Sequence, residues 1–195
     1  MLIHKLISYT AVTVLAGVWW IAPPDAFAQS ETDVGEVAAL GGGSLGTGAN
    51  PVVMGSAGIA FSRYGMALFD LSFMPLGQHT IQPWPARSTV TRSYLYDFGV
   101  DFHVRVPVGE RWAPYGIVGT GLLWNIIHQD TVDSYGLALG RRFYQFNGAL
   151  HTGGGVRYYV RKGWGIRSEV RVVVSKEVYT QLLAGIFYVT PSTWP

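Results

Sequence analysis

The sequence predicts an all-β fold, an eight-stranded antiparallel up-and-down transmembrane barrel that is preceded by a cleavable signal peptide. Three observations lead there. A long stretch from Tyr94 to Val106 alternates strictly between apolar and polar residues, residues 1–28 have the composition of an export signal, and eight segments of strand character follow from Val34 onward. Together they indicate a chain that leaves the cytoplasm and crosses a membrane with strands.

The stretch from Tyr94 to Val106 carries an aromatic or branched apolar residue at every second position. A strict period of two predicts a β-strand with one apolar and one polar face. The stretch is long for a strand in a soluble sheet. A strand tilted by about 45° needs roughly 9 to 11 residues to cross the hydrocarbon of a bilayer, and this length is met here.

The apolar face of this strand could point outward to lipid or inward, as in a soluble ligand-carrying barrel such as a lipocalin. The interior of an eight-stranded barrel is only just wide enough for side chains to fill, so several aromatic residues from one strand would overfill it. We therefore expect the apolar face to meet lipid. This orientation predicts that Val100→Arg disrupts assembly, whereas Gly99→Ser is mild.

Residues 1–28 read as the signal peptide. His4 and Lys5 form a short basic start, Leu6 to Ile21 form a mostly apolar run, and Ala26 to Ala28 form a small-x-small cleavage site. The alternative is a membrane-anchoring helix, but the apolar run is short for a span and two prolines follow it. Residues 29–195 are then expected to form one outer-membrane barrel domain.

Composition narrows the function classes. The chain has no cysteine, which excludes disulfides, thiolate metal sites, cysteine nucleophiles and lipoprotein-type acylation. The formal net charge is only +2 and no basic stripe exists, so we expect no nucleic-acid partner. No other segment approaches a spanning helix, so membrane residence is expected to be by strands. We expect a monomer.

The eight expected strands are separated by glycine, proline and polar residues. In chain order they are Val34–Gly43, Val52–Ser62, Met66–Leu76, Tyr94–Val106, Trp112–Ile127, Phe146–Val160, Gly165–Val174 and Val178–Val189. The first is weak because it is rich in alanine and glycine. An even number of strands places both ends of the barrel on the same side of the membrane.

Two of these strands alternate between apolar and polar or small residues in the same way as Tyr94–Val106. In the third, Asp70 and Ser72 alternate with an apolar face made of Ala67, Phe69, Leu71 and Phe73. In the fifth, Gly119 and Gly121 lie opposite a face made of Val118, Leu122, Trp124 and Ile126. Glycine inside a small barrel makes room for a bulky neighbour.

The connections between strands alternate in length. The second, fourth and sixth are short, whereas the first, third and fifth are longer, and only the short seventh connection breaks the pattern. Outer-membrane barrels have short periplasmic turns and longer external loops. We therefore expect residues 44–51, 77–93 and 128–145 to form external links, with His79 and His128 in or at the start of the longer two.

Charged residues on the polar faces are expected to line the interior. Arg167, Glu169 and Arg171 alternate with apolar residues, and an arginine facing lipid near the midplane would cost about 2 to 4 kcal/mol. The expected interior charge network comprises Asp70, Asp97, Asp101, His103, Arg105, Arg157, Arg167, Glu169 and Arg171. It could serve a gated pore or a proton-linked site, or it could be a salt-bridged plug, and the plug is favoured because a narrow lumen admits little water.

The hairpin of the sixth and seventh strands permits a prediction of register. With a turn centred on Gly163, Arg157 is expected directly across from Glu169. A shift of two residues would set Arg157 against Arg167, where like charges repel. In the expected register, Trp164 lies at the periplasmic interface, where an indole ring is favoured.

No catalytic, cofactor or metal site is expected. His103 and His151 have no ligand partners at recognisable spacing, and His151 and Thr152 point to opposite faces of one strand. The glycine clusters lack the strand-to-helix context of a phosphate-binding loop. Four arginines near the expected outer rim could meet lipid phosphates or be solvated loop residues, and both readings stay open for Arg87, Arg92, Arg141 and Arg142.

Several phrases resemble a known family. The signal peptide, the hairpin at Arg63–Gly65, the run Gly153–Tyr159 and the following Trp164–Arg171 resemble the small outer-membrane barrels of the OmpA and OmpX type. The resemblance implies location in the bacterial outer membrane. Its partners would be the assembly machinery and outer-membrane lipid, including lipopolysaccharide. The family's assembly signal, Gly-x-x-aromatic-x-aromatic, is matched by Gly185 and Tyr188, while Thr190 stands at the final aromatic position.

These patterns predict a non-enzymatic outer-membrane protein with a structural, adhesive or narrow-pore role. Two alternatives are kept. One is a lipid-modifying outer-membrane enzyme, which would need a nucleophile, a histidine and a carboxylate on the lipid-facing wall or outer rim. The other is a soluble periplasmic ligand-binding barrel.

Overall fold

The computed structural model describes residues 33–46, 48–84, 87–132, 138–161 and 163–191. The expected signal peptide at residues 1–28 and its cleavage site lie outside these ranges. Among the described residues, no helix is long and apolar enough to cross a membrane.

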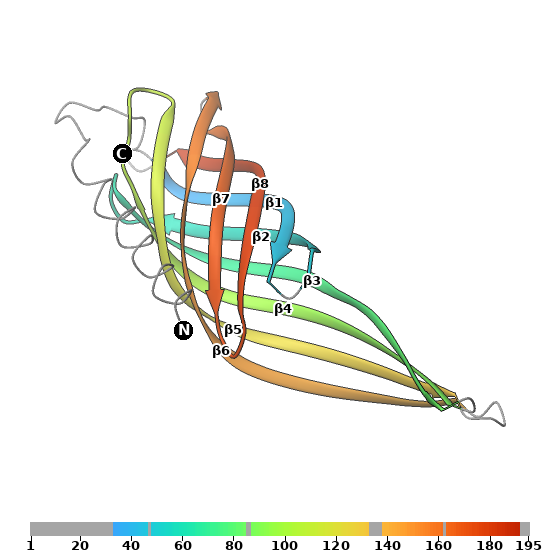
Figure 1. Cartoon of the computed structure of the whole chain (residues 1–195). Helices are drawn as coiled ribbons and strands as arrows, with labels where there is room; N and C mark the ends of the chain where they lie inside the picture. The colour runs from blue at the N-terminus through green and yellow to red at the C-terminus, as the bar shows by residue number, and fades with distance from the viewer. Residues whose placement is uncertain (1–32, 47, 85–86, 133–137, 162, 192–195) are drawn as a thin grey trace, which may run out of the picture.

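Eight strands form one closed barrel in which every strand pairs with its neighbours in the chain and β1 pairs with β8 (Figure 1). All pairings are antiparallel. The strands are β1 Asp33–Leu45, β2 Asn50–Ala60, β3 Gly65–Trp84, β4 Arg87–Arg105, β5 Trp112–Val132, β6 Ala138–Arg161, β7 Trp164–Val174 and β8 Val178–Pro191. The expected up-and-down barrel is confirmed.

The alternation along β4 determines which residues face inward. Val100 and Phe102 are 46% and 49% exposed on the outer surface, whereas Asp101 and His103, which alternate with them, are fully buried. Apolar side chains also dominate the exposed outer face of the other strands, and the buried polar residues face the lumen. This is the apolar-out, polar-in pattern of a membrane barrel.

Four of the strands are much longer than the others. β3 to β6 have 19 to 24 residues, whereas β1, β2, β7 and β8 have 11 to 14. The pairing of β3 with β2 ends at Phe73, and the pairing of β6 with β7 ends at Leu150. Beyond these residues β3 to β6 pair only with one another. They continue as a four-stranded sheet that protrudes from the barrel (Figure 1).

We call this protruding sheet the extension. It comprises residues 74–84 of β3, 87–95 of β4, 125–132 of β5 and 138–145 of β6, which are joined row by row across the sheet. Residues 77–93 and 128–145 were expected to be loops, and that expectation is wrong, because most of them are strand. His79 lies on β3 and His128 on β5. Outside a membrane both faces of a sheet meet water, so the apolar alternation that identifies a strand is lost.

The lumen is filled in three layers. Apolar side chains close the end nearest the extension, where the cluster comprises Leu40, Val52, Met54, Met74, Leu95, Leu123, Ala149, Val173, Tyr179 and Leu183. A smaller cluster closes the other end and comprises Ala113, Tyr159, Phe187 and Val189. The charged residues lie between the two clusters, and this middle layer is the candidate site.

Candidate functional site

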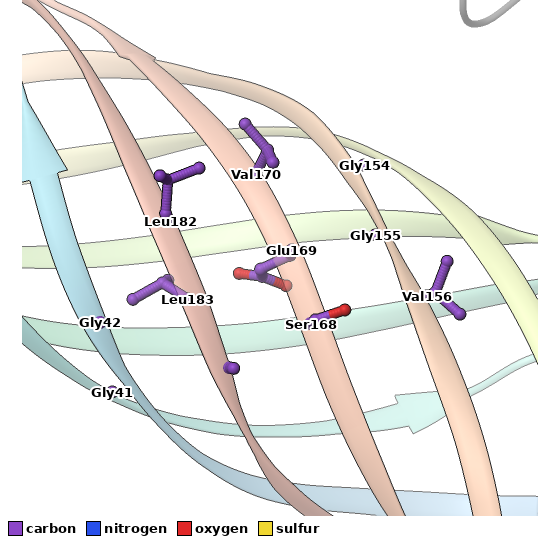
Figure 2. A pocket seen from close by; sticks show the side chains of 11 residues that line it. Gly41, Gly42, Gly154, Gly155, Val156, Ser168, Glu169, Val170, Leu182 and Leu183 are labelled. Carbon is purple, nitrogen blue, oxygen red and sulfur yellow. The ribbon is translucent and has the colours of Figure 1, made fainter.

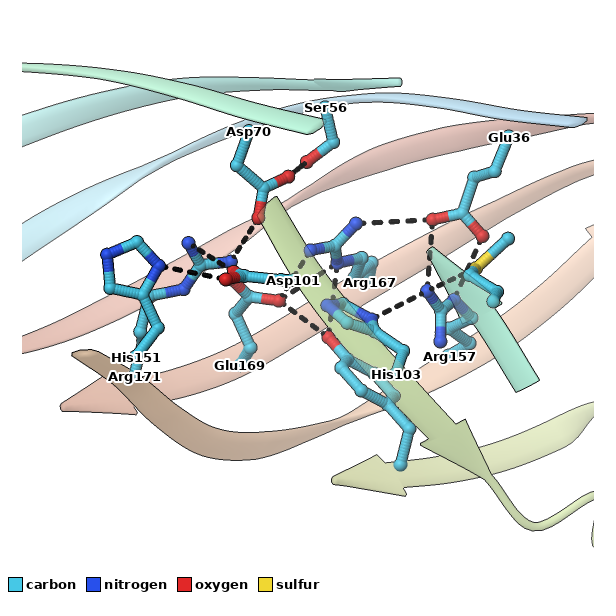
Figure 3. Close-up of polar contacts among 12 residues, drawn as sticks. Glu36, Ser56, Asp70, Asp101, His103, His151, Arg157, Arg167, Glu169 and Arg171 are labelled. Carbon is cyan, nitrogen blue, oxygen red and sulfur yellow. Dashed lines mark hydrogen bonds and ion pairs between the residues drawn. The ribbon is translucent and has the colours of Figure 1, made fainter. Parts of the chain in front are cut away.

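The middle layer of the lumen contains buried charged and polar side chains from seven strands, and we call it the ion-pair layer (Figure 3). It comprises Glu36, Ser56, Asp70, Asp97, Asp101, His103, Arg105, Tyr115, His151, Arg157, Arg167, Glu169 and Arg171. The structure places all nine sequence-predicted residues on the lumen side. Glu36, Ser56, Tyr115 and His151 join them without having been predicted.

Glu36 of β1 is the acceptor at the end of the layer nearest the smaller apolar cluster. Its two carboxylate oxygens accept hydrogen bonds from Nε and Nη2 of Arg157, each at 3.1 Å. Nη1 of Arg167 donates to the same carboxylate at 3.2 Å. Two buried guanidinium groups therefore share one carboxylate, and these contacts join β1 to β6 and β7 across the lumen.

Tyr115 of β5 lies at the centre of this group. Its hydroxyl donates to Oε2 of Glu169 at 2.8 Å and accepts from Nε of Arg167 at 3.1 Å. The guanidinium carbon of Arg157 lies 4.2 Å from the centre of the tyrosine ring, in a cation–π contact. The His103 ring stacks on Tyr115 with centroids 4.8 Å apart. One aromatic ring thus keeps two cations and a histidine in fixed positions.

The predicted register of β6 and β7 is wrong by two residues. Arg157 lies across from Arg167, and Glu169 lies across from Gly155. The like charges are tolerated because Glu36 bridges both guanidinium groups and Glu169 holds Arg167 at 2.8 Å. The prediction took account of β6 and β7 alone. It therefore did not include Glu36, the acceptor that reaches across the lumen from β1.

Arg171 organises the half of the layer nearer the extension. Nη2 donates to Asp70 Oδ2 at 2.6 Å and to Glu169 Oε1 at 3.1 Å, and Nη1 lies 2.9 Å from Asp101 Oδ2. Ser56 also donates to Asp70. One guanidinium is therefore ion-paired with carboxylates from β3, β4 and β7.

His151 of β6 is held between two carboxylates of β4. Nδ1 lies 2.8 Å from Asp101 Oδ1, and Nε2 lies 3.3 Å from Asp97 Oδ2. Glycine provides the space, because a Cβ on Gly99 or Gly121 would come within 2.7 Å of the imidazole Cε1. The sequence showed no partners for this histidine, because its neighbours are on a strand that is far away in the chain.

The last predicted member, Arg105, lies near the turns that join β2 to β3 and β4 to β5. Its Nε donates to the backbone carbonyl of Arg63 at 2.9 Å. Arg105 thus fastens the end of β4 to the turn between β2 and β3.

The layer does not fit a metal ion. Asp70, Asp101 and His103 offer ligand atoms within 4.8 Å of one another. Both carboxylates are ion-paired to Arg171, however, and Arg157 Nη2 lies 3.1 Å from His103 Nδ1. A cation would have to displace these guanidinium groups from the positions it needs.

A shallow hollow of about 440 Å³ marks the outer wall over β6, β7, β8 and β1 (Figure 2). Small outward residues such as Gly154, Ser168 and Ala184 produce it, since their short side chains leave the wall thin between Val170 and Leu182. Its lining offers no catalytic constellation.

No family model and no curated protein sequence matches this chain. Among solved structures, Neisserial surface protein A matches with a TM-score of 0.55 and 17% identity over 80% of this chain and 96% of that one. Ail, the attachment invasion locus protein of Yersinia pestis, has a TM-score of 0.48 and 11% identity over 81% and 99% of the two chains. The N-terminal β-barrel domain of Pseudomonas aeruginosa OprF has a TM-score of 0.49 and 16% identity over 82% and 98%.

The chain has the fold of the small eight-stranded outer-membrane barrels.

An outer-membrane barrel carries an apolar band between two girdles of aromatic residues. Near the extension, ring contacts join outward aromatic residues of β3 to β6, with centroids 5.1 to 6.3 Å apart, and they comprise Phe73, Tyr94, Tyr96, Trp124, Tyr144 and Phe146. At the other end, Trp112 contacts Tyr158 and Trp164 contacts Tyr188. Phe146 and Tyr158 are about 12 residues apart on β6, which at about 3.3 Å per residue and a tilt of about 45° spans roughly 28 Å. This height suits the hydrocarbon of a bilayer.

Proposed function

We propose that this protein is a closed, non-conducting barrel of the bacterial outer membrane that displays the extension at the cell surface as an adhesive binding element. The observation that carries the proposal is the sealed lumen. The ion-pair layer joins side chains from one wall to the other, and an apolar cluster closes each end. This filling of the lumen favours an anchoring role over a pore role.

The position of the first and last described residues of the barrel supports this orientation. Asp33 and Pro191 pair at the end of the barrel opposite the extension, where the turns 61–64 and 106–111 also lie. In outer-membrane barrels the short turns face the periplasm and the longer segments face outward. The extension is then external.

The edges of the extension suit an adhesive role. β3 beyond Phe73 and β6 before Leu150 have no outer neighbour among the described strands. An extended edge presents unpaired N–H and C=O groups, which an extended segment of another protein can join as an added strand. We propose such a protein segment as the external partner.

The orientation can be tested with cysteine labelling, because the natural chain has no cysteine. Thr80→Cys on the extension is expected to react on intact cells with a polyethylene-glycol maleimide that is too large for porins. Glu110→Cys, which is exposed at the opposite end, is expected to react only after the outer membrane is permeabilised. The reverse pattern would contradict the proposed display.

The sealed lumen and the adhesive role need separate measurements. Planar bilayers containing the full-length protein are expected to show no stable conductance steps, and large salt-proportional steps would contradict a closed barrel. For adhesion, residues 79–91 and 129–141 are each replaced by an Asn-Gly turn, which leaves the barrel intact. Bacteria carrying this variant should adhere to host cells less than bacteria with the full chain, and equal adherence would exclude the extension as the adhesive element.

A further inference from the structure

We propose that the outward face at the base of the extension binds the phosphate groups of lipid A, the lipid anchor of lipopolysaccharide, through Arg92, His128 and Arg142. The proposal rests on the proposed orientation, in which this face meets the outer leaflet. It assigns a lipid site to side chains that the ion-pair layer does not use.

The three cationic or titratable side chains form one row across the sheet. Gln78 of β3 pairs with Arg92 of β4, Arg92 with His128 of β5, and His128 with Arg142 of β6. Residues directly opposite one another in antiparallel strands point to the same face. Neighbouring strands are about 4.8 Å apart, so Arg92 and Arg142 are separated by roughly 10 Å. Lipid A carries a phosphate at each end of its disaccharide, and two arginines at this spacing can meet both.

The row lies at the depth where lipid phosphates are found. Tyr94 and Tyr144 belong to the aromatic girdle. Arg92 and Arg142 lie on the same face of the sheet, each two residues farther from the barrel than its tyrosine. At about 3.3 Å per residue and a tilt of about 45°, the cations lie roughly 5 Å beyond the rings. Aromatic girdles mark the boundary of the hydrocarbon, so the cations reach the headgroup level.

Both arginines are available to a ligand. Arg92 and Arg142 are exposed, and within the described ranges neither is ion-paired to a carboxylate. Nε of Arg92 donates to Gln78 at 3.4 Å, which orients the guanidinium and leaves its terminal nitrogens for a bidentate phosphate contact. Tyr94 holds the His128 ring edge-on at 5.9 Å. Asp130 lies one row farther out on this face and marks the limit of the basic row.

The chain supplies a matched control on the adjacent residue. Arg141 precedes Arg142 on β6 and pairs with Gln129, so it points to the opposite face of the same sheet. Replacing Arg141 removes the same charge from the same strand without touching the proposed site. Lys176, exposed in the turn between β7 and β8, completes a control with two charges removed.

The test uses the full-length protein in micelles of an uncharged detergent, titrated with fluorescent diphosphorylated lipid A. R92Q/R142Q is expected to bind about 25-fold more weakly than the natural chain, at about fivefold for each arginine, whereas R141Q/K176Q should bind as tightly. Equal affinity of R92Q/R142Q and the natural chain would overturn the proposal, as would an equal loss in R141Q/K176Q.

A second ligand separates phosphate recognition from contact with sugar or acyl chains. Lipid A without its phosphates should bind the natural chain as weakly as diphosphorylated lipid A binds R92Q/R142Q, and tight binding would overturn the proposal. Inorganic phosphate should compete only at far higher concentration, since it lacks the anchoring acyl chains. Competition by an acidic polypeptide at the lipid's own concentration would overturn the lipid assignment in favour of a protein partner.

The outcome is distinguishable from failure of the proposed function. Micelles have no inside or outside, so lipid A binding is measured whichever side of the membrane carries the extension. If Thr80→Cys were inaccessible on intact cells while R92Q/R142Q still lost binding, the display would be wrong and the lipid site would stand.

Discussion

Strands β3 to β6 run through both the barrel wall and the extension, yet the two regions obey different rules. Along the barrel wall one face is apolar and outward, and the other faces the ion-pair layer or the two apolar clusters, so polar and apolar residues alternate most clearly beside the ion-pair layer. In the extension beyond Met74 and Leu95 both faces lie outside the closed barrel, and polar and apolar residues mix on each. A single strand such as β4 therefore changes its pattern where its surroundings change, which teaches that alternation records the environment of a strand rather than the strand itself.

The largest expected effect on stability comes from replacing an arginine of the ion-pair layer with methionine. The same replacement in the extension, made in a separate variant, serves as the comparison. Arg171→Met leaves Asp70, Asp101 and Glu169 without their shared cation, and an uncompensated buried charge costs about 3 to 5 kcal/mol. Arg142→Met in the extension should change the free energy of unfolding by less than about 0.5 kcal/mol. Urea unfolding in detergent micelles measures both. Equal midpoints for the two variants would show that the lumen does not depend on its charge pairing.

A second prediction compares two outward valines of β4. Val100 is 46% exposed on the lipid face of the barrel, and Val90 points to the same face ten residues away on the extension. Val100→Arg should lower stability in lipid vesicles by about 2 to 4 kcal/mol and impair insertion, because it places a cation near the midplane. Val90→Arg should insert like the natural chain. If Val100→Arg inserted equally well, the outward assignment would be wrong.

The smallest expected effect concerns the glycines around His151. The sequence suggests that Gly99→Ser is mild, but a Cβ there would lie 2.7 Å from Cε1 of an imidazole held by two carboxylates. Overpacking of this kind typically costs about 1 to 3 kcal/mol. Gly55→Ser, with nothing within 4 Å of the new atom, serves as the control. Removing the ring in Gly99→Ser/His151→Ala should reduce the cost of the serine, and a double-mutant cycle without coupling would refute the contact.

The fold could be predicted because lipid and lumen impose opposite demands on neighbouring residues. Asp101 and Val100 reveal their faces in the sequence, and the same holds for Arg167, Glu169 and Arg171 on β7. Glu36 was missed because β1 is rich in glycine and alanine, which obscures its period of two. Tyr115 was missed because an aromatic side chain reads as lipid-facing, although here its hydroxyl and ring are both engaged in the lumen.

The register error has a related cause. Rules for pairing side chains compare residues on adjacent strands, where like charges directly opposite each other are destabilising. By those rules Arg157 would not lie across from Arg167. A lumen this narrow lets an acceptor on β1 reach both arginines, so the partner that decides the register comes from a strand that the hairpin does not contain. Such contacts depend on closure of the barrel and leave no signal in the local sequence.

The position of Glu36 also constrains how the barrel assembles. Its partners Arg157 and Arg167 are 121 and 131 positions later in the chain. Suppose that the hairpins inserted into the membrane one after another. The first hairpin would then carry an unpaired carboxylate into the hydrocarbon and the later ones unpaired guanidinium groups, each at a cost of several kcal/mol. Neutralisation is complete only when the whole ring of strands is present. Insertion is therefore expected to be a late, all-or-none event that follows gathering of the complete chain at the membrane surface, and its slow step is the meeting of the first strand with the last three.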